Sequence, residues 1–202
     1  MAFTYFFRDL QTLELLTKYV IPVVNGNRYI RVWDAGCAHG PEPFSIAILI
    51  REEMSHFMFR NVQITATDID TSSQFGEIIR KGIYPENEVK RIPKDIREKY
   101  FSRVGNNGHF QVSDEIRGSV EYSQHDLLTL KLVRSGFNLV VCKNVLLHFA
   151  LDQQIDVIRM FHDALNEGGF LITEQTQKLP NKISHLFKRV TTNGQLFQKA
   201  KV

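Results

Sequence analysis

A hydrophobic strand, a glycine-cornered loop and a helix follow one another in the run Arg31–Ala47, which constrains the fold more than any other stretch. Gly36 and Gly40 stand where the chain must turn sharply and where a ligand can approach bare backbone. The N–H groups that open the next helix can meet an anionic or polar ligand. The spacing is D-x-G-x-x-x-G, not the G-x-G-x-x-G of dinucleotide binders, and it points to S-adenosylmethionine (SAM). An ordinary strand-to-helix turn is the alternative.

Length and composition indicate one domain with a sizeable core, because the chain has 202 residues and 43% of them are hydrophobic. Its net charge of +3 does not favour a nucleic-acid partner. We expect the two cysteines, Cys37 and Cys142, to be reduced packing residues and not catalytic thiols. No apolar run approaches the ~20 residues that span a bilayer, and no signal-peptide pattern opens the chain. We therefore expect a cytoplasmic protein without membrane insertion.

Strands and helices are expected to alternate along most of the chain. The expected strands are Tyr29–Val32, Val62–Ala66, Val120–Tyr122, Phe137–Cys142 and Phe170–Thr173, with the fourth central because it is apolar except for Asn138. The expected helices are 9–20 (ended by Pro22 and the Asn25–Asn27 cluster), Pro43–Met54, one that ends near Lys81, and Asp152–Leu165 (broken by Gly168 and Gly169). This alternation predicts an α/β fold with a doubly wound, mostly parallel sheet and right-handed crossovers.

Two segments depart from the alternation. Residues 83–118 contain Pro85, Pro93 and a Gly105–Gly108 turn, and they predict a helix with a small antiparallel β insert. Near the C-terminus, Leu186–Val190 and Gln195–Lys199 flank an Asn-Gly turn, which predicts a β-hairpin.

Seven separated stretches form one ordered pattern: Thr4–Asp9, Trp33–Ala47, Ala66–Asp70, Arg80–Tyr84, His125–Leu128, Val141–Phe149 and Leu165–Leu171. The first reads T-Y-F-F-R-D, the third A-T-D-I-D and the sixth V-C-K-N-V-L-L-H-F. In order and spacing the pattern resembles the catalytic domain of the CheR-type chemoreceptor methyltransferases, and the resemblance covers nearly the whole chain.

The resemblance implies a Rossmann-like, SAM-dependent protein-glutamate O-methyltransferase with a small antiparallel β-subdomain inserted in its sheet. Residues 1–202 would be the catalytic domain and 83–118 the insert. The substrate would be glutamate side chains on the cytoplasmic helices of chemotaxis receptors, or another protein carboxylate, and the product S-adenosylhomocysteine. We expect a monomer. The N-terminal helical domain usual in the family is absent from this sequence, which begins almost at the T-Y-F-F-R-D motif.

Methyl transfer to glutamate makes modest chemical demands. A carboxyl group with a pKa near ~4.3 is already ionised at neutral pH, so no strong general base is needed. Placing the carboxylate oxygen in line with the methyl carbon can supply most of the catalysis, and a partly dry site helps because charge is neutralised. No metal is required, and the seven histidines form no H-x-x-x-H pair.

Two acids are candidate cofactor ligands. Asp68 ends the second strand, where its carboxylate can accept both ribose hydroxyls; its alternative role is helix capping, for which Asp70 and Thr71 also qualify. Glu42 opens the helix after the glycine loop and matches a cofactor-contacting glutamate of the family. Its alternative role is a favourable interaction with the helix dipole.

The N-terminal motif and the third strand supply further candidates. Arg8 is expected to pair with the methionyl carboxylate of SAM, or else to be a solvated surface arginine. Thr4 is expected to assist by hydrogen bonding, or else to cap the first helix. Asp126 replaces the family's asparagine on the adenine side, where it can accept but not donate a hydrogen bond. Leu127 either packs on the adenine base or fills the core.

Asn144 follows the fourth strand and faces the crevice where α/β folds bind ligands, so it can orient the methionyl group or the incoming carboxylate; its alternative role is stabilising a turn. His148 stands where the family has an active-site tyrosine, Lys143 replaces an arginine and Phe44 replaces a tyrosine. The candidate catalytic residues are Arg8, Asn144 and His148, and the remaining candidate cofactor contacts are Ala35, Gly36, Gly40 and Ile69.

Three competing functions are open from the sequence. A catalytically silent SAM-binding module of a signalling complex could use the insert's strand edge to capture a peptide. A nucleic-acid methyltransferase is disfavoured by the balanced charge and by the lack of a Pro-Pro-aromatic motif after Asn144. A small-molecule acceptor is compatible with the same cofactor half.

Overall fold

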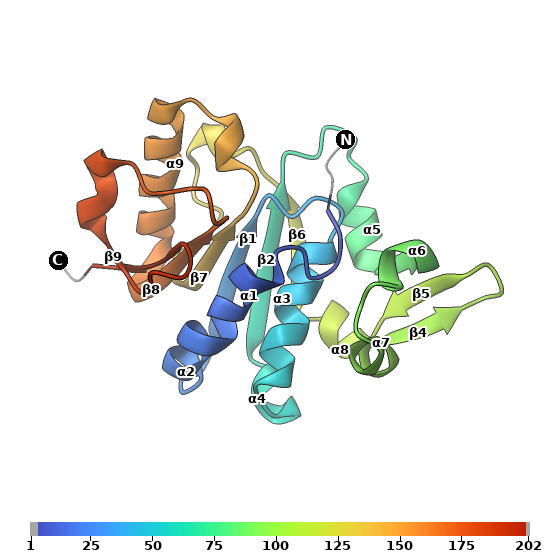
Figure 1. Cartoon of the computed structure of the whole chain (residues 1–202). Coiled ribbons are helices and arrows are strands. Elements are labelled where there is room, and N and C mark those ends of the chain that lie inside the picture. The colour runs from blue at the N-terminus through green and yellow to red at the C-terminus, as the bar shows by residue number, and fades with distance from the viewer. Residues whose placement is uncertain (1–3, 201–202) are drawn as a thin grey trace.

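The computed structural model describes residues 4–200 and arranges them around a seven-stranded sheet in the order β6-β2-β1-β7-β8-β10-β9 (Figure 1). Its strands are β1 (Ile30–Ala35), β2 (Val62–Asp68), β6 (Val120–Gln124), β7 (Phe137–Cys142), β8 (Leu165–Thr173), β9 (Phe187–Arg189) and β10 (Leu196–Lys199). The strands from β6 to β8 are parallel, whereas β10 pairs antiparallel with β8 and β9. The predicted fold class and C-terminal hairpin are confirmed.

The central strand β7 shows why this sheet is covered on both faces. All six of its residues are buried, and it lies between β1 and β8 as its apolar sequence predicted. Because side chains alternate across a strand, Leu139 and Val141 join one hydrophobic cluster, whereas Val140 and Cys142 join the other.

Helices cover these two faces. The helices of the main domain are α1 (Leu10–Leu15), η1 (Leu16–Val20, a π-helical turn), α2 (Ile21–Val24), α3 (Pro41–Glu52), α4 (His56–Phe59), α5 (Phe75–Lys81) and α9 (Leu151–Ala164), with short 3₁₀ turns η2 (Leu127–Thr129), η3 (Leu146–His148) and η4 (Asn181–Leu186). α1 to α3 pack into the first cluster and α9 into the second. Trp33 of β1 meets Phe161 of α9 edge to face at 5.1 Å and donates a 2.9 Å hydrogen bond to Thr67 Oγ1.

Two predicted boundaries were wrong. Pro22 does not end the first helical stretch, because it occupies the first turn of α2, where its missing N–H costs no hydrogen bond. The stretch ends at the Asn25–Asn27 cluster, the other predicted end, with Asn25 as the C-cap of α2. Gly168 and Gly169 do not break the last helix either. α9 ends at Ala164, β8 begins at Leu165, and the two glycines lie within β8 where its pairing with β7 is irregular.

Between α5 and β6 the chain forms a second, three-stranded antiparallel sheet in the order β3-β5-β4, which projects to one side of the main sheet (Figure 1). Its elements are β3 (Ile83–Pro85), α6 (Glu86–Val89), α7 (Lys94–Tyr100), β4 (Phe101–Val104), β5 (His109–Val112) and α8 (Asp114–Arg117). We call this region the insert.

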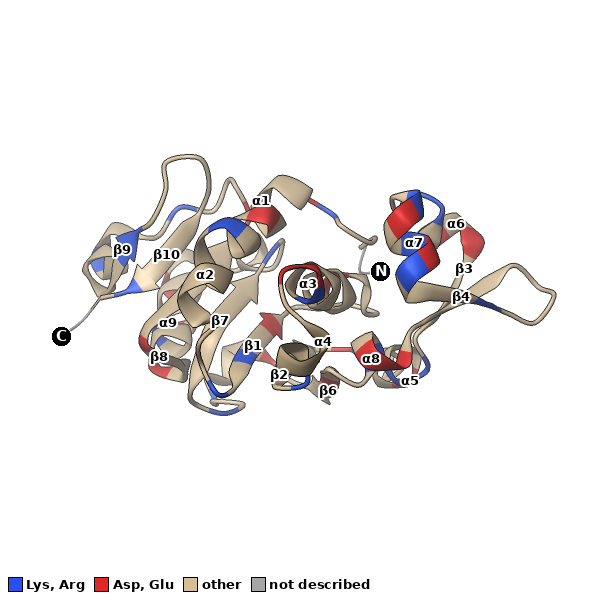
Figure 2. Ribbon diagram, turned by 90° about the horizontal axis from the view of Figure 1, so that it is seen from below, with Lys and Arg blue, Asp and Glu red and all other residues tan. Residues whose placement is uncertain are grey.

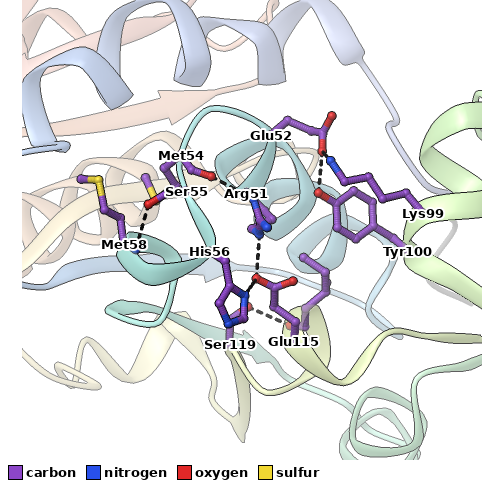
Figure 3. A network of polar contacts seen from close by, with 11 residues as sticks. Arg51, Glu52, Met54, Ser55, His56, Met58, Lys99, Tyr100, Glu115 and Ser119 are labelled. Atoms are coloured by element: carbon purple, nitrogen blue, oxygen red, sulfur yellow. Dashed lines mark hydrogen bonds and ion pairs between the residues drawn. The ribbon is translucent and has the colours of Figure 1, made fainter.

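Polar contacts with the end of α3 hold the insert in place (Figure 3). The carboxylate of Glu52 accepts hydrogen bonds from Lys99 Nζ at 2.6 Å and Tyr100 Oη at 2.5 Å. Glu115 Oε1 is 2.6 Å from Arg51 Nε and 2.7 Å from His56 Nδ1. Phe6 adds apolar contact, because its ring meets Tyr84 and Phe101 edge to face.

Within residues 4–200, no helix combines the length and hydrophobicity needed to cross a membrane.

Candidate active site

A cavity of about 630 Å³ opens at the carboxyl ends of β1, β2, β6 and β7, which is within the size range of small-molecule sites. Parallel α/β sheets bind ligands at this edge. Ten of the residues predicted from the sequence line the cavity: Thr4, Arg8, Gly36, Glu42, Asp68, Ile69, Asp126, Leu127, Asn144 and His148. Segments separated by more than 100 residues therefore converge on one site.

The glycine loop is built around two left-handed positions. Gly36 has a φ of +105°, and a Cβ placed there would lie 2.2 Å from Val145 Cγ2. Gly40 has a φ of +109°, and its Cβ would lie 2.5 Å from Tyr84 Oη. Any other residue would be strained and would also clash. Gly36 lines the cavity, whereas Gly40 packs against the insert and Ala35 is buried in the core, so neither lies among the cavity-lining residues.

Asp68 and Asp70 divide the two tasks that the sequence left open. Asp68 lines the cavity, and its carboxylate accepts N–H hydrogen bonds from Ala38 at 3.0 Å and Asp70 at 3.1 Å. Asp70 accepts the N–H groups of Gln74 at 3.2 Å and Phe75 at 2.9 Å, and so caps α5. Asp68 is thus held by the glycine loop while its carboxylate faces the cavity.

Glu42 lies on the first turn of α3 and is paired with a lysine that we had not included among the site residues. The Lys143 ammonium is fully buried, and it donates to Glu42 Oε2 at 2.9 Å and to the Arg8 carbonyl at 2.9 Å. Both Lys143 and Glu42 line the cavity. One cation therefore ties the N-terminal motif to the helix of the glycine loop.

A second acid lies beneath this pair. Asp34 of β1 is fully buried, and its pKa is raised well above the usual range, first by burial and then by the nearby Glu42 carboxylate. Burial thus favours the neutral form of Asp34, whereas Glu42 is the acid that contacts the Lys143 ammonium.

The loop after β7 presents Asn144 and His148 to the cavity. Asn144 adopts the left-handed conformation with a φ of +59°, and its N–H donates to Glu174 Oε2 at 3.1 Å. Glu174 is a buried residue directly after β8 that sequence reasoning missed. His148 is exposed on η3. The buried carboxylate thus stabilises an unusual turn that directs Asn144 to the site.

The remaining lining residues define two ends of the cavity. Asp126 caps η2 by accepting the Leu128 N–H at 2.9 Å, and Leu127 is both buried in the core and in contact with the cavity. His125 also lines this end, and burial lowers its pKa, so its imidazole is neutral at pH 7. Thr4 lines the cavity and does not cap α1, which has Asp9 at its N-cap.

Neither thiol is poised for nucleophilic chemistry. Cys37 and Cys142 are both buried and unbridged, and burial raises the pKa of each thiol well above its usual value. Among the described residues no His, Cys, Asp and Glu cluster has the arrangement of a metal site. The polar groups of the site are therefore carboxylates, the Arg8 guanidinium, the buried Lys143 ammonium, the Asn144 amide, two imidazoles and two threonine hydroxyls.

Comparison with solved structures supports the fold. N-methyltransferase NodS from Bradyrhizobium japonicum, solved with S-adenosylhomocysteine, aligns with a TM-score of 0.51 over 96% of this chain and 88% of its own at 11% identity. The chain therefore has the fold of a Rossmann-like SAM-dependent methyltransferase.

Sequence comparison identifies the family. The family model described as CheR methyltransferase, SAM binding domain, matches residues 2–195, so the chain belongs to the CheR methyltransferase family. A chemotaxis protein methyltransferase from Pseudomonas aeruginosa is 30% identical over 212 residues, covering 98% of this chain and 73% of the relative. A probable one from Rhizobium etli is 29% identical (93% and 72%), and one from Vibrio cholerae 31% (91% and 64%). The chain thus spans about two thirds to three quarters of these relatives.

Proposed function

We propose that this protein is a SAM-dependent methyltransferase that forms methyl esters on glutamate side chains of chemotaxis receptors in the cytoplasm, acting as a monomer. The observation that carries the proposal is the convergence of ten predicted residues on one cavity at the carboxyl edge of the sheet. Membership of the CheR family supports the same reaction, and the similar chemotaxis protein methyltransferases support a role in chemotaxis.

The residues present fit SAM. Gly36 leaves room for a ligand against bare backbone, and Asp68 offers a carboxylate suited to two ribose hydroxyls. Arg8 suits the methionyl carboxylate, because a guanidinium can form two parallel hydrogen bonds with it. Leu127 and Ile69 provide apolar surface for the adenine base, and Asp126 provides an acceptor for its amino group. When bound, SAM would supply an electrophilic methyl group.

The other residues position the acceptor and exclude water. A glutamate acceptor is already ionised at neutral pH, so the site needs no strong base, and the neutral His125 is consistent with that. Asn144 can donate a hydrogen bond from its side-chain amide to the incoming carboxylate, and His148 of η3 can donate one from its imidazole ring. Lys143 is fully engaged by Glu42 and the Arg8 carbonyl, so we assign it a positioning role.

Calorimetry with S-adenosylhomocysteine tests the cofactor site. Saturable one-to-one binding is expected. A folded sample that shows no binding would contradict the enzyme and favour an interaction module.

The acceptor is tested by incubating the protein with methyl-labelled SAM and receptor cytoplasmic fragments. Label that mild alkali releases as methanol identifies a carboxyl ester, and this is the expected result. Alkali-stable label would place the methyl group on nitrogen and exclude glutamate.

A further inference from the structure

Positive charge is concentrated at one end of the chain. The last 28 residues hold six of the 25 Lys and Arg residues and none of the 22 Asp and Glu residues. Residues 1–174 therefore hold 19 basic and 22 acidic side chains. The net charge of +3 conceals a basic C-terminal segment joined to a slightly acidic remainder.

Four of these cations are individually exposed on η4, β9 and the segment before them. We call Lys178, Lys182, Lys188 and Arg189 the basic surface; all four are exposed. Figure 2 shows blue and no red on the ribbon at β9. Within residues 4–200 none of the four forms an ion pair, whereas Lys199 of the same segment pairs with Glu167.

Several cations elsewhere on the molecule are paired with nearby acids. On α5, Lys81 pairs with Glu77 at 2.6 Å, and on the insert Lys99 pairs with Glu52 at 2.6 Å. Of the C-terminal cations, Lys199 pairs with Glu167 at 3.3 Å and is largely covered. The basic surface therefore keeps its charge available to a partner.

Hydrogen bonds connect the start of this segment to residues that line the cavity. Glu174, immediately before it, accepts the N–H of the cavity-lining Asn144. Gln177 Nε2 donates to Gln154 Oε1 at 2.9 Å, and Gln154 Nε2 donates to the carbonyl of the cavity-lining Phe149 at 3.0 Å. The segment that carries the basic surface therefore begins beside the cavity.

Apolar side chains border the cavity on this side. Leu147 lines the cavity and is 50% exposed, and Leu151 at the start of α9 is 62% exposed. A protein segment that lay across the mouth would cover both. This combination of an apolar rim and a nearby unpaired charge is typical of protein interfaces.

We propose that the basic surface docks an acidic protein segment and so delivers an acceptor glutamate to the cavity. The proposal rests on the function proposed above, because that reaction requires a glutamate-bearing protein. Two features of residues 175–200 favour protein over other polyanions. Both phenylalanines, Phe187 and Phe197, are buried, so no aromatic platform is offered for nucleobases. No large apolar side chain of this segment is exposed to enter a lipid surface.

Fluorescence anisotropy with a labelled, glutamate-rich helical peptide tests the docking. The double variant Lys182→Glu/Lys188→Glu reverses two charges on the basic surface. Its affinity for the peptide should fall about tenfold or more at low salt, and the difference should shrink as salt screens the charges. The matched control, Lys90→Glu/Lys94→Glu, reverses two exposed lysines of the insert region and should retain wild-type affinity.

Equal loss in both double variants, or no loss in the first, would overturn the proposal. Binding of a single-stranded oligonucleotide or anionic vesicles more tightly than the peptide would also overturn it, in favour of a general polyanion surface. Calorimetry with S-adenosylhomocysteine, run on every variant, separates the two proposals. If the Lys182→Glu/Lys188→Glu variant keeps both cofactor binding and the wild-type affinity for the peptide, only the docking proposal is rejected. If the wild-type protein binds the peptide but neither binds the cofactor nor transfers methyl groups, only the enzyme proposal is rejected.

Discussion

Lys143 has more structural consequences than any other single residue near the cavity. Its buried ammonium is shared by the side chain of Glu42 and the backbone of Arg8, two groups that belong to different elements. A buried charge that loses its partner is costly, whereas a matched neutral pair can be tolerated.

Replacing Lys143 should therefore destabilise the fold as well as the site. Lys143→Met leaves Glu42 buried without a cation, and we expect the free energy of unfolding to fall by about 3 kcal/mol. Lys143→Arg should lose less, because it keeps the charge. Urea denaturation measures both changes. The double variant Lys143→Met/Glu42→Gln should recover part of the loss, and a double variant as unstable as the sum of its parts would refute the pairing.

Asp68 and Asp70 give a matched test of ligand binding against capping. Asp68→Ala removes the carboxylate that faces the cavity, and affinity for S-adenosylhomocysteine should fall roughly 10- to 100-fold by the cost of a hydrogen-bonded charge. Asp70→Ala removes the α5 cap, and stability should fall by about 1 kcal/mol while the affinity changes little. Calorimetry and thermal denaturation measure the two effects, and the reverse pattern would exchange their roles.

Local sequence predicted the cavity residues well but missed the ones that hold them. Gly36, Asp68 and Asn144 follow strand ends, which is a short-range signal. Nothing in the local sequence indicates that Lys143 and Glu174 are buried, because a lysine or glutamate after an apolar strand is usually exposed. Only the folded chain reveals their partners, which lie 101 and 30 residues away.

Among the elements, α3 joins the insert to the main sheet. Arg51 and Glu52 near its end contact Glu115 and Tyr100 of the insert (Figure 3). Burial acts to raise the pKa of Glu115, but hydrogen bonds from Arg51 and His56 outweigh it and leave the pKa lowered.

This lowered pKa predicts a pH-dependent attachment. A carboxylate whose pKa is depressed by folding stabilises the native state above its unfolded pKa of about 4.3, and that stabilisation is lost as the pH falls through the folded value. Glu115→Gln should thus be less stable than wild type by about 0.5–1 kcal/mol at pH 7, and the gap should close in acid. Urea titrations across pH measure this. Glu98→Gln, which removes an exposed carboxylate 3.7 Å from Lys94, is the surface control for the loss of a negative charge.

Element identities were predictable, whereas several boundaries were not. β7 was correctly placed at the centre because six apolar-rich residues suit a strand buried on both faces. Pro22 misled because a π-helical turn lets a new helix begin just before it. Gly168 and Gly169 led to a wrong boundary because the pairing of β8 with β7 outweighed the local tendency of glycine to end a helix.

For the molecule as a whole, cofactor binding should couple distant segments. The cavity is lined by Thr4 and Arg8, by the ends of β1 and β2, and by the loop after β7. Saturating S-adenosylhomocysteine, at about 100 times its Kd, should stabilise the native state by ~2.7 kcal/mol and raise Tm by roughly 5–10 °C. Differential scanning calorimetry measures the shift. The Asp68→Ala variant at the same concentration should show a smaller one, and equal shifts would contradict its role.

The strand order also bears on synthesis at the ribosome. β1, β2 and β6 emerge early and can pair with one another, but the open side of β1 receives β7 only after residue 142 has been made. Until then the nascent chain carries an apolar strand with unpaired backbone groups on one side, which is the kind of edge that attracts other chains. The edge of β1 is therefore open to other chains from the time β1 folds until β7 has been made.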